Sequence, residues 1–404
     1  MSAEGAVPAA ATAQPALAIL PLLAAAGFVT GCGIRLLDPL LPLIAYDLGV
    51  SVAEVAVLVT SFAIPYGLCQ VLLGPLGDRF GKLRVLVLGV LLYGLAMAVC
   101  AVAGSLGQLV ALRAVTGALG GAIIPLAMAW IGDNVPYEER QATISRFLTG
   151  IVLSQLLTGP VSGSVGQAVG WRGAFLLVGV LAALTGAGIM LRLGGGLWRS
   201  GAAGPGQLGF ATHRMLLRRP AARRLLAVAF LDGALLFGGA FPFIGSYLIQ
   251  GFHLEPWQAG LVVAGFGLGS LIYTRLASRL VRRLGEIRLL MLGGGLLSVA
   301  LLGIALAPGW AMVAVPQVLL GLFFFMFHGV LQARATEVLP EARATAVSAF
   351  SMALFLGQGV GSIGFGAVLA QAGYPAVFLG AAAGILLLSL WCWRGLSPER
   401  GAAA

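Results

Sequence analysis

The sequence predicts an all-α integral membrane protein with twelve transmembrane helices, arranged as two pseudo-symmetric halves of six helices each. Of its 404 residues, 59% are hydrophobic and only 9% are charged, whereas soluble domains carry roughly 25% charged residues. The apolar residues form blocks of about 20 residues or more, which is long enough to cross a bilayer as helix. These blocks lack the two-residue alternation of a membrane barrel. Because backbone polar groups in lipid must be paired within the protein, we expect the blocks to be helical.

The polar breaks between the apolar blocks give the order of the elements. Residues 1–16 are rich in Ala and Pro and lack the basic region of a signal peptide, so we expect a disordered cytoplasmic tail. The first six-helix half is expected over 17–195 and the second over 224–395. A polar cytoplasmic linker at 196–223 joins them, and a tail follows at 396–404. The expected spans are 17–46, 52–77, 84–105, 107–132, 142–168 and 172–195, then 224–250, 256–281, 287–307, 309–333, 343–371 and 374–395.

The basic residues give the orientation. Twelve spans place both termini on one side, and of the 24 Lys and Arg residues all but Arg35, Arg113 and Arg172 fall at span ends on that side. This is the positive-inside pattern, which predicts cytoplasmic termini. Heavy use of Ala, Gly and Arg with a single lysine, Lys82, indicates a bacterial source and hence the inner membrane. The net charge of +10 therefore reflects topology, and no nucleic acid partner is expected.

The two halves repeat each other. Polar and glycine positions recur at a nearly constant spacing, which chance similarity between apolar segments does not readily produce. Parallel six-helix repeats place a transport site between the halves, near the middle of the bilayer. The matching pairs are Gly81 with Gly285, Arg84 with Arg288, Arg140 with Arg343, Gln155 with Gln358, Gly163 with Gly366 and Phe175 with Phe378.

The break after the second span carries the most specific motif. Its residues are Gly74, Pro75, Leu76, Gly77, Asp78, Arg79, Phe80, Gly81, Lys82, Leu83 and Arg84. This stretch resembles the loop signature of the major facilitator superfamily, G-x-L-a-D-r-x-G-r-k, except that Leu83 stands at the second basic position. The resemblance implies the major facilitator fold over nearly the whole chain.

The same resemblance implies a conformational latch. Asp78 would bind the opposite half in the outward-facing state, and Arg79, Lys82 or Arg84 would reach Asp133. The simpler alternative is a polar turn that obeys the positive-inside rule. The second half has Arg282 where the first has the acid, so any latch there must work differently.

Two further motifs lie inside spans. Leu109 to Gly120 contains an arginine, Arg113, and resembles the family's second motif, which implies that Arg113 assists proton transfer at a nearby acid. The alternative is an arginine that extends to the outer interface. Gly150, Gly159, Pro160 and Gly163 resemble the family's antiporter motif, which implies export, although Gly and Pro in membrane helices also serve packing alone.

Several charged and polar residues lie within the apolar blocks. Arg35 and Asp38 are spaced to share a helix face, and charges at such depth usually serve function. Asp38 is the candidate protonation site; the alternative is a static ion pair that braces the helix. Asp232 is a second candidate for proton coupling. The alternative is that Asp232 pairs with arginines at the cytoplasmic rim. His328 is a candidate residue of the substrate cavity; the alternative is a packing residue. Gln155 and Gln358 are candidates for polar contacts in the same cavity.

These observations favour a non-enzymatic secondary transporter that resembles the drug–proton antiporter branch of the superfamily. It would be monomeric, without cofactor or metal, and would export small drug-like molecules against protons by alternating access. One alternative is an importer or exchanger of a small organic anion, with Arg35 and Arg113 binding the carboxylate. Another is a non-transporting receptor or lipid-handling protein on the same scaffold.

Overall fold

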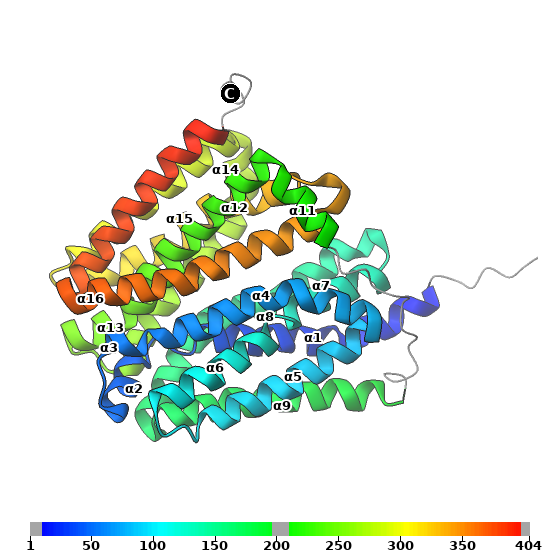
Figure 1. Ribbon diagram of the computed structural model, residues 1–404, viewed down its shortest axis with the longest axis horizontal. Coiled ribbons are helices and arrows are strands. Elements are labelled where there is room, and N and C mark those ends of the chain that lie inside the picture. The colour runs from blue at the N-terminus through cyan, green and yellow to red at the C-terminus, as the bar shows by residue number, and fades with distance from the viewer. Residues whose placement is uncertain (1–9, 196–209, 397–404) are drawn as a thin grey trace, which may run out of the picture.

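The computed structural model describes residues 10–195 and 210–396, and the described chain is all helical (Figure 1). Residues 1–9 of the expected tail, 196–209 of the expected linker and 397–404 lie outside the described residues. Helix α1 begins at Ala10, inside the expected tail. The first half comprises α1 (Ala10–Arg35), α2 (Leu41–Leu48), α3 (Val52–Val55), α4 (Val57–Phe80), α5 (Lys82–Cys100), α6 (Leu106–Gly120), α7 (Ile123–Asn134), α8 (Tyr137–Val169) and α9 (Trp171–Leu193).

The second half begins with a short helix that the sequence did not lead us to expect. This helix, α11, lies within the region predicted to be a loop. The elements that follow include a π-helix, η1, placed directly after Asp232. The bounds are α11 (Phe210–Arg218), α12 (Pro220–Asp232), η1 (Gly233–Ala240), α13 (Phe241–Phe252), α14 (Pro256–Ala305), α15 (Ala311–Ala335), the 3₁₀ turn η2 (Pro340–Ala342) and α16 (Arg343–Leu396).

The prediction of twelve spans is confirmed for the described residues. Nine helices are long and apolar enough to cross a membrane. Two of them, α14 and α16, each contain two spans joined at a glycine in the left-handed region, Gly285 (φ 70°) and Gly373 (φ 76°). The remaining span is α1 continued by α2. In the first half, the corresponding joints are also glycines with positive φ, Gly81 (φ 93°) and Gly170 (φ 82°). Only glycine adopts this conformation without steric cost.

Helix α1 is interrupted before α2, and proline explains the break. Pro39 has no amide hydrogen to donate to the carbonyl of Arg35, and the amide of Asp38 bonds to that carbonyl instead at 3.1 Å. Residues 36–40 therefore form a turn between the two helices. The turn brings Arg35 and Asp38 to the boundary between the two halves of the protein.

The two halves contact each other closely at one end, which we call the α2 end. Figure 1 shows α2, α3 and α13 gathered there, while the first turn of α1 lies at the opposite end, which we call the terminal end. Near the α2 end, Thr60 Oγ1 donates to the carbonyl of Gly359 at 2.7 Å, and Ser362 Oγ donates to the carbonyl of Ala56 at 2.8 Å. These bonds join α4 to α16 and hold the halves together at the α2 end.

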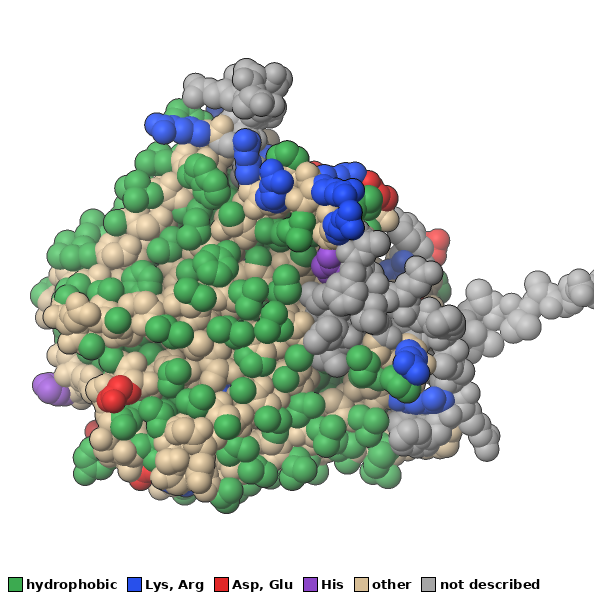
Figure 2. Space-filling model, viewed as in Figure 1, with side chains coloured by type: hydrophobic (Ala, Val, Ile, Leu, Met, Phe, Trp, Pro, Cys, Tyr) green, Lys and Arg blue, Asp and Glu red, His purple; other side chains and the backbone are tan. Residues whose placement is uncertain are grey.

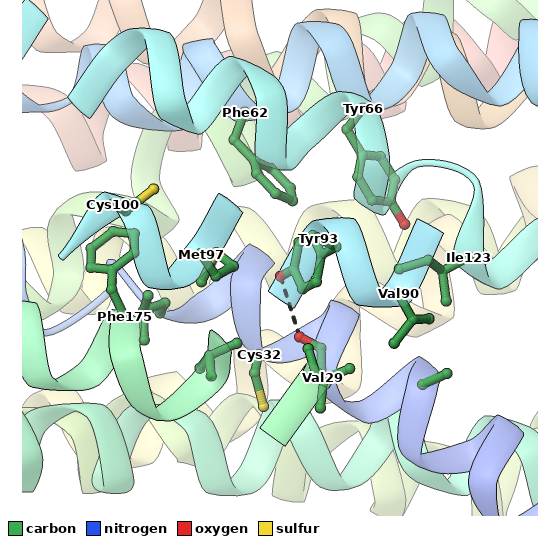
Figure 3. Packing of buried hydrophobic residues seen from close by; sticks show 14 of the residues in the cluster. Val29, Cys32, Phe62, Tyr66, Val90, Tyr93, Met97, Cys100, Ile123 and Phe175 are labelled. Atoms are coloured by element: carbon green, nitrogen blue, oxygen red, sulfur yellow. Dashed lines mark hydrogen bonds between the residues drawn. The ribbon is translucent and has the colours of Figure 1, made fainter. Parts of the chain in front are cut away.

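Each half has an apolar core, and the outer surface is apolar as well. In the first half, Tyr93 and Met97 of α5 pack against Val29 and Cys32 of α1, and the Tyr93 hydroxyl donates to the Val29 carbonyl at 3.3 Å (Figure 3). Figure 2 shows hydrophobic side chains across the visible face and basic side chains gathered toward one end. Such a surface suits a protein surrounded by lipid, with its charges in the aqueous layers.

Candidate functional site

Arg35 is the central residue at the interface between the halves. Its side chain is buried, and its Nε donates to Oε1 of Gln155 on α8 at 2.8 Å. The guanidinium carbon lies 4.0 Å from the centre of the Phe241 ring and 4.6 Å from that of Phe237. A third ring, Phe266, is centred 5.5 Å away. Arg35 thus crosses from the first half into an aromatic pocket of the second.

Asp38 lies one turn further along and faces a small cavity between the halves. The cavity is lined by α1 and α4 on one side and by η1, α13 and α16 on the other, and it also touches Arg113 and Gln358. It has about 10 Å³ for the centre of a water-sized molecule, the room that one water needs. In this conformation the cavity therefore has no room for an organic substrate.

The expected ion pair between Arg35 and Asp38 is not formed. Among the described residues, Arg35 makes its side-chain hydrogen bond with Gln155, and no donor contacts the Asp38 carboxylate. The helix is broken at Pro39, so the spacing that would place the two side chains on one face of a regular helix does not apply. The alternative of a static intrahelical brace loses its basis.

Arg113 is buried and points inward, so it does not extend to the outer interface. Both of its terminal nitrogens lie 3.2 Å from the carbonyl oxygen of Gly33. The guanidinium also lies 4.2 Å from the centre of the Phe62 ring. Gly33 stands close to the C-terminal end of α1, where carbonyl groups lack helical partners and a positive charge is favourable. Arg113 thus stabilises the broken end of α1 and shares the cavity with Asp38.

Asp232 and His328 form a buried pair inside the second half. The two side chains are 1% and 8% exposed, and His328 Nδ1 lies 2.7 Å from Asp232 Oδ2. The other carboxylate oxygen, Oδ1, has no hydrogen-bond partner. Sequence reasoning treated these residues separately and considered arginines at the rim as partners of Asp232; the structure brings α12 and α15 together instead. The His328 ring stacks on Phe324 at 4.7 Å between centroids.

The glycines of the α8 motif lie at two different contacts. A methyl group on Gly150 would stand 2.0 Å from the carbonyl oxygen of Ala24 on α1, within the same half. On Gly159 it would stand 2.7 Å from the carbonyl oxygen of Gly260, and on Gly163 it would stand 2.3 Å from that of Pro256. The last two contacts are with α14 of the opposite half. Gly159 and Gly163, on either side of Pro160, therefore permit backbone contact between the halves.

The candidate latch residues lie at the terminal end, where α4 meets α5. Lys82 Nζ lies 2.5 Å from Asp133 Oδ2, which joins α5 to α7 within the first half. Arg79 is exposed and lies over the ring of Phe80, and Arg84 borders an apolar groove on the outer surface. Gly74 and Asp78 lie in α4, but the Asp78 side chain is outside the described residues, so its partner in a latch stays a prediction.

At the α2 end, an ion pair and a hydrogen bond connect α2 to α9. Arg172 Nη1 lies 2.5 Å from Asp47 Oδ2, and the indole nitrogen of Trp171 donates to the same oxygen at 3.1 Å. The hydrogen bond from Arg172 and then that from Trp171 lower the pKa of the Asp47 carboxyl from its usual value. Trp171 is only 2% exposed, so its ring packs inside the protein.

The structure therefore brings together Arg35, Asp38, Arg113, Gln155 and Gln358, and keeps Asp232 and His328 apart as a second site. Sequence reasoning missed the aromatic rings of Phe237, Phe241 and Phe266. They lie in two different helical spans, and apolar spans contain many such rings. The pair Phe237 and Phe241, four residues apart on a span facing the other half, was the one signal available.

Comparisons with known proteins agree with this architecture. The family model described as Major Facilitator Superfamily matches residues 23–362 and 233–403. YwfA of Bacillus subtilis, described as an uncharacterized transporter of this type, is 25% identical over 355 residues, covering 87% of this chain and 85% of the relative. PmrA of Streptococcus pneumoniae, described as a multi-drug resistance efflux pump, is 26% identical over 364 residues, covering 87% and 89%. The crystal structure of a D-xylose–proton symporter superposes with a TM-score of 0.77 at 16% identity, covering 95% of this chain and 98% of that chain.

Proposed function

The chain belongs to the major facilitator superfamily of secondary transporters, and from this premise we propose that it exports small drug-like molecules in exchange for protons. It does so by alternating access, with the two halves rocking about the site between them. The observation that carries the proposal is the cavity at the interface, which is lined by both halves and contains the buried carboxylate of Asp38.

Asp38 is the proposed site of proton exchange. It is 6% exposed, and no described donor contacts its carboxylate. An ionised carboxylate without partners is unfavourable in such surroundings, so closing the halves around Asp38 favours its protonated form. Opening to water permits ionisation. Arg113 lines the same cavity, and its positive charge favours release of the proton when the cavity is wet.

The Asp232–His328 pair is the proposed second site of proton exchange. Asp232 lies directly before the π-helix η1, and η1 carries Phe237, whose ring contacts Arg35. Phe324, stacked on His328, also contacts the Phe237 ring with centroids 4.8 Å apart. Protonation of the pair therefore acts on the site through two adjacent rings, which would couple a proton in the second half to the position of Arg35.

Export is the proposed direction. Two glycines of the segment that resembles the antiporter motif, Gly159 and Gly163, lie at the contact between the halves, and the relative PmrA is described as an efflux pump. With the termini in the cytoplasm, the α2 end faces outward and is closed in this conformation. Substrate would then enter from the terminal end, where residues Gly74 to Arg84 and Asp133 are proposed to form the latch of the outward-facing state.

Proton release from acidic-interior proteoliposomes tests this function. Addition of lipophilic cations or neutral antibiotics should release protons with the wild type, and Asp38→Asn should reduce the response at least about tenfold. Glu337→Gln, which changes an exposed acid at the end of α15, should leave the response unchanged. A normal response in the Asp38→Asn variant would remove Asp38 from the mechanism, and no proton movement with any compound would contradict proton-coupled export.

A second candidate, a carrier of small organic anions, is favoured by one observation. Two buried guanidinium groups, Arg35 and Arg113, line the cavity between the halves together with the carboxylate of Asp38. In the same assay, a response limited to organic acids and lost in Arg35→Ala would support the anion carrier.

A further inference from the structure

The rings around Arg35 form an aromatic cage, which we define as Phe237, Phe241 and Phe266. Phe241 and Phe266 are each 2% exposed, and their rings meet edge to face with centroids 4.9 Å apart. Phe237 and Phe266 also meet edge to face at 6.0 Å. Ring faces turned toward one point present the negative part of the aromatic quadrupole, which attracts a cation.

The cage and the cation inside it belong to different halves of the protein. Phe237 lies on η1, Phe241 on α13 and Phe266 on α14, all in the second half. Arg35 comes from α1 and is held by Gln155 on α8, both in the first half. When the halves separate at the α2 end, Arg35 moves with the first half. The cage then opens onto the space between the halves, and one of its rings, Phe237, already lines the cavity that Asp38 faces.

The chemistry of the empty cage favours an organic cation. Among the described residues, the charged group recorded over all three rings is Arg35, which belongs to the first half. Once Arg35 has left, an anion would face the negative surfaces of the rings. A lipophilic cation would gain both cation–π attraction and apolar contact, and Asp38 on the opposite wall of the cavity would supply the counter-charge when it is ionised.

We propose that the aromatic cage binds the charged group of an organic cation, and that Arg35 occupies the cage in its place while no substrate is bound. The inference rests on the proposed export function and gives its substrate class. Substrate cation and Arg35 compete for one site, so return of Arg35 into the cage excludes the substrate.

Equilibrium binding of radiolabelled tetraphenylphosphonium tests this competition. The full-length chain is placed in nanodiscs without a pH gradient, with empty nanodiscs as the blank. We expect Phe241→Ala to weaken binding at least about tenfold, because a desolvated cation–π contact is lost. Phe241→Tyr keeps the ring and should bind within about threefold of wild type. Trp310→Ala, which removes an exposed aromatic side chain between α14 and α15, should bind as wild type does.

Arg35→Gln gives the decisive result. Removing the competing guanidinium should tighten binding of the phosphonium several-fold. Weaker binding in Arg35→Gln, or equal binding in Phe241→Ala and wild type, would overturn the proposal. Binding of benzoate that is lost in Arg35→Gln would do so as well and would support the anion carrier. Because no gradient is present, the cage is tested separately from proton-coupled export: cation binding without proton release in proteoliposomes would leave the cage standing and reject the coupling.

Discussion

At the scale of single residues, Asp232 and His328 depend on each other. Both side chains are almost fully buried, and His328 supplies the single hydrogen bond that the Asp232 carboxylate receives among the described residues. Cys392 of α16 lies close enough to Asp232 to interact with it electrostatically. Removing one member of the pair leaves a buried polar group without a partner, which costs more than the bond itself contributes.

A double-mutant cycle measures this dependence. Asp232→Ala and His328→Ala should each lower the free energy of unfolding by about 3 kcal/mol, as for one partner of a buried pair. The double variant should lose about 1–3 kcal/mol less than the sum of the two. Denaturant titration in mixed micelles gives these values, with the exposed Glu337→Ala as control, expected within about 0.5 kcal/mol of wild type. Strictly additive losses would show that the pair is not coupled.

The sequence predicted which charged residues would be buried, but not their partners. Arg35, Asp38, Arg113 and Asp232 stand in apolar blocks, where charge is costly and must be compensated. Their contacts depend on where helices distant in the sequence meet. Pro39 breaks the helix between α1 and α2, and the side chain of Arg35 bonds Gln155 on α8. The contact between α12 and α15 decides that Asp232 meets His328. These are properties of the tertiary structure, which periodicity within one helix does not contain.

At the scale of helices, α8 determines how closely the two halves approach. Gly159 and Gly163 place its backbone against that of α14, where a methyl group would overlap carbonyl oxygens. A side chain here therefore disfavours the conformation with the α2 end closed, while it has no such effect once the halves separate.

Gly163→Ala should shift the protein toward the conformation open at the α2 end. Spin labels at Tyr46→Cys and Trp310→Cys, two exposed positions at this end on opposite halves, would report a longer distance. The four native cysteines are replaced by serine beforehand. Gly364→Ala is the matched control, since a methyl group there meets no atom within 4 Å, and its distance distribution should equal that of wild type. An unchanged distribution in Gly163→Ala would mean that α14 yields locally instead.

The helices themselves were the most predictable feature, and the joints explain why the repeat was visible in sequence. Gly81 and Gly285 match because both joints need a left-handed residue between two helices. The joint at Gly373 corresponds in the same way to that at Gly170. The short helix α11 was missed because its nine residues are not apolar enough to be distinguished from a polar linker.

At the scale of the whole molecule, the charge distribution predicts the orientation in the membrane. Basic side chains gather toward the terminal end, where the joint at Gly285 lies, whereas Asp47 and Glu54 lie near the α2 end. The positive-inside rule then predicts that the terminal end lies in the cytoplasm.

Labelling of single cysteines in cells checks this orientation. A membrane-impermeant maleimide should label Tyr46→Cys in intact cells, because this side chain is 92% exposed at the α2 end. Arg282→Cys, exposed near the joint at Gly285, should react only after the membrane is permeabilised. The reverse pattern would invert the topology and, with it, the proposed direction of transport.

The ion pairs at the terminal end show how the two halves have diverged. In the first half Lys82, just after the joint at Gly81, meets Asp133 near the end of the next span; in the second half Glu286, just after the joint at Gly285, meets Arg334, and the two charges are exchanged. If the halves descend from one duplicated ancestor, selection has preserved the attraction while exchanging the amino acids that provide it. Among related proteins, the signs at positions 82 and 133 should therefore covary, as should those at 286 and 334, even where no single residue is conserved.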